Sequence, residues 1–156
     1  MIAYSRHSKL GMIVCALLAA GCGGSAYTIL PPNSGVALSP SDQLAVATRE
    51  AVDAVNSEVG QNLLVVAKGQ FASKVMYEAM SFGCGKFMIE SREIRVAEKA
   101  ECPPVIVIIH EAGHALGVVK HSADPTSIMY PIINRDMTVH DAAVSLVDEL
   151  AKLNLL

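Results

Sequence analysis

The feature that most constrains the fold of this 156-residue chain is an unbroken apolar run, Val105–Ile109, that leads directly into closely spaced polar residues. These are His110, Glu111 and His114, and on a helix the two histidines, four residues apart, lie on one face. The apolar run predicts that this helix is buried, and Pro103-Pro104 suits its first turn. Buried polar groups need a partner. Two surface histidines would explain the spacing but not the apolar run, so we favour a shared metal ion.

The residues that follow the predicted helix add to the metal-site hypothesis. Gly117 can adopt the left-handed conformation that ends a helix and turns the chain back, which brings His121 toward the same ion. Met129 lies in a predicted turn and can form an apolar floor beneath the ligands. Glu111 is next to the first histidine, where its carboxylate can take a proton from a metal-activated water as that water attacks a peptide carbonyl.

The motif His110-Glu111-x-x-His114-x-x-Gly117, together with the segment His121–Pro131, resembles the metzincin metallopeptidases. The second part, with its His-Ser start and Met-Tyr-Pro ending, is most similar to the matrixin branch. The resemblance implies a zinc endopeptidase on a small α+β domain with a twisted mixed sheet, an active-site helix and a C-terminal helix. The implied roles are zinc ligand for His110, His114 and His121, general base for Glu111, and Met-turn residue for Met129.

One departure from the family pattern concerns the third histidine. The family has two residues between the glycine and this histidine, whereas the chain has three, and Lys120 stands at the expected position. An ammonium group cannot ligate zinc. We expect the extra residue to bulge outward while His121 still binds. Asp124 and Glu149 are the alternative third ligands, because a carboxylate can complete a zinc site.

Two functions from different classes fit this pattern. The first is a zinc-dependent endopeptidase that hydrolyses protein or peptide substrates with a metal-activated water and Glu111 as general base. The second is a zinc-binding lipoprotein without proteolytic activity, which would act as a binding or structural module. Glu111 favours the enzyme, since zinc retention alone does not need this carboxylate. We expect no second zinc site, because His140 is predicted to be a solvated residue of the last helix.

The first 22 residues have the pattern of an export signal. A basic start with Arg6 and Lys9 precedes an apolar stretch, Leu10–Ala20, which is too short to span a bilayer. The ending Ala19-Ala20-Gly21-Cys22 resembles a bacterial lipobox, which implies a lipid on Cys22 and an anchor to a bacterial membrane. An ordinary signal peptide that releases a secreted protein is the alternative. Residues 23–41, rich in Gly, Pro and Ser, are predicted to be a flexible tether.

The charge and the cysteine content bear on the possible partners and on the redox compartment of the protein. The net charge is −3, and removal of Arg6 and Lys9 with the signal makes it −5, with no basic cluster that would favour nucleic acid. In an oxidising compartment Cys84 and Cys102 most simply form a disulfide, and a free zinc-binding thiol is the weaker alternative.

Hydrophobic periodicity predicts one domain over residues 42–156. A helix is expected over Asp42–Val59, capped by Ser41 or Ser39 and stopped by Gly60. Strands are expected over Leu63–Ala67, which should be buried, and over residues 87–89 and 93–97, while residues 71–82 are ambiguous. A last amphipathic helix is expected over residues 138–153, begun by a capping pair of Thr138 and Asp141. This order of elements indicates an α+β fold.

Overall fold

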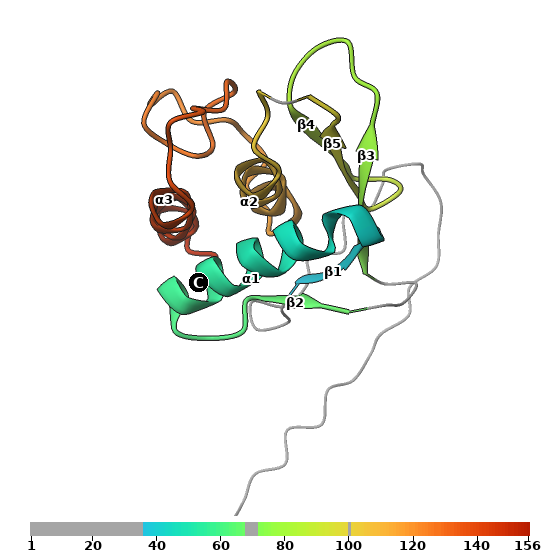
Figure 1. The fold of residues 1–156 in the computed structure, drawn as a ribbon. Helices are drawn as coiled ribbons and strands as arrows, with labels where there is room; N and C mark the ends of the chain where they lie inside the picture. The colour runs from blue at the N-terminus through green and yellow to red at the C-terminus, as the bar shows by residue number, and fades with distance from the viewer. Residues whose placement is uncertain (1–35, 68–71, 100) are drawn as a thin grey trace, which may run out of the picture.

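The fold is a mixed sheet with helices packed against it, as the computed structural model of residues 36–67, 72–99 and 101–156 shows (Figure 1). Its elements are, in chain order, β1 (Val36–Pro40), a 3₁₀ turn η1 (Asp42–Leu44), α1 (Ala45–Val59), β2 (Leu64–Val66), β3 (Ser73–Glu78), β4 (Gly85–Met88), β5 (Glu93–Ala97), α2 (Pro104–Ala115) and α3 (Val139–Lys152). The predicted α+β class is therefore confirmed.

The strand order of the sheet is β2-β1-β3-β5-β4. β1 pairs in parallel with both β2 and β3, and β3 pairs in parallel with β5. β4 runs antiparallel to β5 and forms one edge of the sheet. This arrangement places an edge strand beside α2, the helix that carries the polar motif, since α2 lies between α3 and the strands β4 and β5 (Figure 1).

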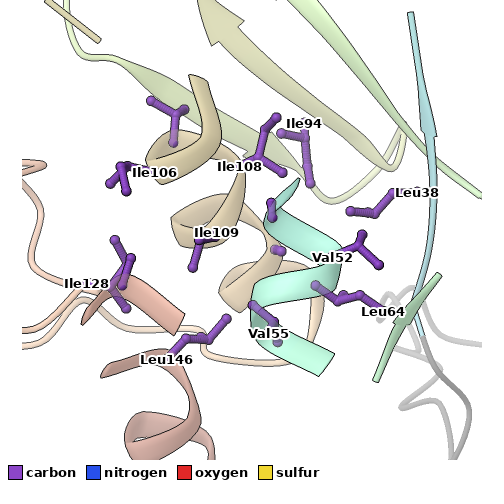
Figure 2. Close-up of a cluster of buried hydrophobic side chains, with 14 of the residues drawn as sticks. Leu38, Val52, Val55, Leu64, Ile94, Ile106, Ile108, Ile109, Ile128 and Leu146 are labelled. Atoms are coloured by element: carbon purple, nitrogen blue, oxygen red, sulfur yellow. The ribbon is translucent and has the colours of Figure 1, made fainter. Parts of the chain in front are cut away.

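The core forms around α2, which is nearly enclosed by the other elements. Val107, Ile108, Ile109 and Ala112 of this helix are completely buried. Figure 2 shows how side chains of α2 meet those of α1, the strands, the segment before α3 and α3 itself; the labelled ones are Leu38, Val52, Val55, Leu64, Ile94, Ile106, Ile108, Ile109, Ile128 and Leu146. The prediction of one buried helix that runs into the motif is confirmed, and it begins with Pro104 in its first turn.

The structure corrects two predictions, for the segments that form β1 and β2. The tether predicted for residues 23–41 is wrong over Val36–Pro40, because these residues form β1 in the interior of the sheet, with Val36 and Leu38 buried against the helices. Its Pro40 is tolerated because it is the last residue of the strand. β2 is a strand as predicted, but it is not buried throughout: it forms the second edge, and Val65 and Val66 are 36% and 42% exposed.

The ends of the helices follow the sequence signals in most places. Gly60 ends α1 in the left-handed conformation, with a φ of 72°. The Thr138 side chain accepts a hydrogen bond from the Asp141 backbone N–H, which confirms the capping pair of α3. The predicted serine cap of α1 is wrong, because the Ser41 side chain makes no cap hydrogen bond and η1 precedes the helix instead.

The predicted signal, the lipidated Cys22 and most of the predicted tether lie outside the described residues. Across the described ranges, no helix is long and apolar enough to cross a membrane.

A disulfide joins Cys84 to Cys102, with the two Cα atoms 5.3 Å apart, which confirms the predicted pairing. Cys84 directly precedes β4, and Cys102 lies two residues before α2. The Cys84 carbonyl also accepts a hydrogen bond from the Ala97 N–H at the end of β5. The disulfide therefore ties the edge strand to the beginning of the motif helix.

Replacing both cysteines by serine should lower the free energy of unfolding. The two cysteines have a sequence separation of 18. Closing a loop of that length stabilises the folded state by roughly 3 kcal/mol, because the cross-link lowers the entropy of the unfolded chain. Urea denaturation followed by circular dichroism measures the change. A reducing agent should lower the stability of the wild-type chain to that of the double variant and leave the variant unchanged. Equal unfolding midpoints for the oxidised wild type and the variant would contradict this role.

Candidate active site

Three histidine rings converge at the C-terminal half of α2. His110 and His114 come from the helix, and His121 comes from the segment that follows it. The ring centroids are separated by 5.1 Å for His110–His114, 5.3 Å for His110–His121 and 5.0 Å for His114–His121. One nitrogen of each ring lies within 4.8 Å of the others, so the three can share one metal ion. In the part of the chain that the structure describes, no other group of three or more His, Cys, Asp or Glu residues could do so.

Backbone carbonyl groups orient the two helical rings. The Nδ1 atom of His110 lies 2.6 Å from the carbonyl oxygen of Ile128, and Nδ1 of His114 lies 2.6 Å from that of Val118. A carbonyl can only accept, so each Nδ1 carries the proton and donates it. Each Nε2 then has a lone pair that can bind a metal.

Burial keeps these two rings in the neutral form that a metal ligand requires. It lowers the pKa of His110 to about 4 and also lowers the pKa of His114. Both shifts arise mainly because a charged imidazolium loses its hydration in the protein interior. The rings are therefore ready to ligate at neutral pH, and a metal does not have to displace a proton from them.

Glu111 is the buried carboxylate of the site. Its side chain is on α2 beside His110, and the residue is only 3% exposed. Burial raises the pKa of Glu111 to about 8, opposed by a hydrogen bond from the backbone N–H of Phe87 on β4. The positive charge of a bound metal would favour the carboxylate form.

Gly85, at the start of β4, permits the close approach of this strand to α2. A Cβ atom at this position would lie 2.8 Å from a Glu111 carboxylate oxygen and would collide with Val107. The sequence reasoning did not identify Gly85. An isolated glycine beside a cysteine carries no signal that distinguishes such an approach from an ordinary turn.

The extra residue before His121 is accommodated at the protein surface. Gly117 has a φ of 109°, and after it the Val118 N–H bonds back to the Gly113 carbonyl at 2.9 Å. Val118 is buried and keeps its position against the helix, whereas Val119 is 80% exposed. Lys120 is also exposed. The outward bulge predicted from the sequence thus falls at residues 119–120, and His121 returns to the other two rings.

The alternative third ligands lie outside the histidine group. The carboxylate of Asp124 accepts hydrogen bonds from the N–H and the hydroxyl of Thr126, at 2.9 and 2.7 Å. Glu149 accepts a hydrogen bond from the Ser127 hydroxyl and pairs with Lys152 at 3.2 Å. Both carboxylates have other partners and neither belongs to the converging set. His140 is an exposed residue of α3, as predicted, with its ring 3.9 Å from Glu58.

Met129 is completely buried and packs against α2 at Gly113, the residue before His114. Its Sδ atom faces Gly113 of α2, where an added Cβ atom would lie only 2.5 Å away. The turn that carries Met129 is closed by a hydrogen bond from the Tyr130 N–H to the Ser127 carbonyl. The predicted turn is therefore present and in contact with the motif helix.

Two hydrogen bonds from α3 hold this turn, and the sequence reasoning did not identify their role. The Ser145 hydroxyl accepts from the Ile128 N–H at 2.8 Å. The Ser127 hydroxyl donates to Glu149 at 2.9 Å and accepts from the Met129 N–H at 3.1 Å. Since Ile128 also provides the carbonyl that orients His110, α3 positions a ring of the site through the turn.

The histidines and Glu111 open into a cavity of about 680 Å³. Its walls are formed by the residues at the start of β4, by the segment around the disulfide, by Val118 and Val119, and by the chain after the Met129 turn. The site is therefore open to solvent next to the edge strand β4.

Residues 40–150 of the chain match the family model of the matrixins. The chain belongs to the matrixin family. Matrixins are zinc metallopeptidases, and the converging group of His110, His114 and His121 fits the zinc site of the wider metzincin class. A comparison with curated proteins finds no match. The matrixin match begins inside β1 and ends inside α3, so it covers almost the whole of the described domain.

The structure predicts that His121, not a carboxylate, is the third zinc ligand of this matrixin. Replacing His121 by alanine should lower zinc affinity by more than about 100-fold, because outer-shell partners alone contribute about 10–100-fold. The variants Asp124→Ala and Glu149→Ala should each bind zinc at least tenfold more tightly than the His121 variant. Competition titration with a chelating dye measures all three. Unchanged affinity in His121→Ala would contradict the assignment.

Gly113→Ala should destabilise the domain although alanine is the better helix former. The helix-propensity gain is about 1 kcal/mol. Against it, the new Cβ would lie 2.5 Å from Met129 Sδ and 2.9 Å from Leu146 Cδ1, and such overpacking costs about 1–3 kcal/mol. Thermal unfolding measures the change. In a Met129→Ala background the same substitution should cost less, and an equal cost in both backgrounds would show that Met129 is not the obstacle.

Proposed function

We propose that this chain is a zinc-dependent endopeptidase that cleaves protein or peptide substrates with Glu111 as general base. The observation that supports this most is the position of Glu111. A carboxylate that is 3% exposed costs free energy to bury, and the three histidines do not need it in order to hold a metal. Its place between the histidines and β4, facing the cavity, suits a group that moves a proton during a reaction.

His110, His114 and His121 would hold the zinc through one nitrogen each. When bound, zinc acts as a Lewis acid that polarises the substrate carbonyl and lowers the pKa of water from 15.7 toward about 7. Glu111 would take the proton from the attacking water and pass it to the amine of the leaving peptide. The Phe87 N–H favours the carboxylate that accepts this proton, whereas burial favours the protonated form that gives it up.

β4 would hold the substrate in an extended conformation. It is the last strand of the sheet, so one of its edges has no strand beside it among the described residues. Gly85, Lys86 and Phe87 of this strand line the cavity next to Glu111. A peptide that adds to such an edge gains main-chain hydrogen bonds irrespective of its sequence. Such pairing would bring a scissile bond beside the histidines, which suits cleavage within a chain.

We further propose that the domain acts outside the cytoplasm, attached to a bacterial membrane through a lipid on Cys22. The disulfide between Cys84 and Cys102 supports export, because such bonds persist in oxidising compartments. Radiolabelled palmitate incorporation into the wild-type chain and into Cys22→Ser distinguishes the lipoprotein from a secreted form.

Glu111→Gln should abolish cleavage without loss of zinc. Removing a positioned general base lowers the rate by about 10²–10⁴-fold. The kcat/KM for a quenched casein substrate should therefore fall by at least about 100-fold. Zinc content, measured by atomic emission on the purified full-length chain, should stay at the wild-type level. Glu50→Gln, which changes an exposed carboxylate on α1, is the matched control and should cleave normally. Zinc binding without cleavage by the wild type would favour the non-proteolytic module instead.

A further inference from the structure

The charged side chains around the cavity differ in whether the protein already provides them with a partner. The basic residues in its lining are Lys86, Lys99 and Arg135, and the acidic ones are Glu101 and Glu111. Lys86 pairs with Glu78 of β3 at 3.0 Å. Lys99 donates to the carbonyl oxygens of Ser81 and Gly83, at 3.3 and 3.4 Å. The charges of both lysines are therefore engaged by neighbouring strands and loops.

Arg135 differs from these lysines. Within the described ranges, its guanidinium makes no hydrogen bond and no ion pair, although it lines the same cavity as His110 and Glu111. The chain as a whole is acidic, with a net charge of −3, so acidic partners are not scarce. A guanidinium that is left without a carboxylate beside a reaction centre is available to a ligand.

The backbone around Arg135 is fixed on both sides. The residue lies in a turn that is closed by a hydrogen bond from the Met137 N–H to the Asn134 carbonyl, at 3.3 Å. The Asn134 side chain also accepts from the Asp136 N–H at 3.0 Å. Ile133 and Met137, which flank the turn, both pack against the hydrophobic core. The fold thus sets the position of the Arg135 backbone, from which the side chain lines the cavity.

The two acidic residues of the lining do not occupy this charge. Glu111 is buried on α2 and has its own role beside the histidines. Glu101 belongs to the segment before α2, next to the disulfide, and is not paired with Arg135. The other lining residues on the segment that carries Arg135 are apolar, namely Pro131, Ile132 and Ile133. A ligand group that fits here combines an aliphatic stem with an anionic end.

We propose that Arg135 selects substrates with an aspartate or glutamate side chain at the residue that lies against segment 131–135. This inference rests on the proposed function, since it takes the ligand of the cavity to be a polypeptide. A guanidinium binds a carboxylate through two parallel N–H···O hydrogen bonds, which gives a geometric preference as well as attraction. Since Arg135 is exposed, salt should weaken the preference.

Peptide binding to the zinc-loaded Glu111→Gln chain tests the proposal without turnover. A fluorescent host peptide carries glutamate, glutamine or lysine, moved one position at a time, and anisotropy gives each Kd. At one position glutamate should bind about three- to tenfold more tightly than glutamine, as expected for an exposed charge pair with good geometry. Adding Arg135→Gln should remove this difference, and adding Arg135→Glu should transfer the preference to lysine. Arg49→Gln, an exposed arginine on α1, should change nothing.

Cleavage of the same peptides by the otherwise wild-type chain separates the two proposals. If peptides are cleaved but Arg135→Gln leaves both binding and cleavage preferences unchanged, the role of Arg135 is overturned and the peptidase stands. If no peptide is cleaved, but peptides with glutamate bind more tightly only when Arg135 is present, the role of Arg135 in binding acidic residues stands and the peptidase activity is overturned. Equal Kd values for glutamate and glutamine at every position overturn the role of Arg135 whatever the cleavage result.

Discussion

The structure depends on one constraint: α2 must be a buried core helix and also present polar groups to a site. Its first half, Val105–Ile109, supplies the apolar contacts that hold the sheet and the other helices together. Its second half carries His110 and Glu111, which are 4% and 3% exposed. Each buried polar group costs free energy unless it is bonded, so neighbouring elements have to reach the helix and satisfy it.

Two glycines allow the neighbouring elements to approach this closely. Gly85 lets β4 approach Glu111, and Gly113 lets the Met129 side chain pack directly against α2 beside His114 in the sequence. The turn that carries Met129 then provides the Ile128 carbonyl for His110, while α3 holds the turn through Ser145 and Glu149. The metal centre is consequently not a local motif. It is the place where an edge strand, a turn and the last helix all meet one buried helix.

The sequence predicted the parts of this arrangement that depend on local periodicity and on a specific motif. The buried helix, its histidines, the capping pair at Thr138 and the outward bulge before His121 follow from neighbouring residues alone. What it missed depends on contacts between distant segments. β1 was missed because a five-residue strand inside a Gly- and Pro-rich stretch has too short a pattern. Its backbone pairing comes from β2 and β3, and the burial of its side chains comes from the helices. The roles of Gly85, Ser145 and Glu149 arise only when separate elements meet.

The polar groups of the cavity divide into those that bind other parts of the protein and those that remain for a ligand. In the cavity lining, the Nδ1 atoms of His110 and His114 and the ammonium groups of Lys86 and Lys99 all bind protein partners and so serve the structure. Among the described residues that line the cavity, the groups that remain for a ligand include the metal-facing nitrogens of the three histidines, the Glu111 carboxylate and the Arg135 guanidinium. They match, in turn, a metal ion, a proton in transit and an anion. Because most polar groups around the cavity have protein partners, those that remain for a ligand indicate its chemistry more directly than the shape of the cavity does.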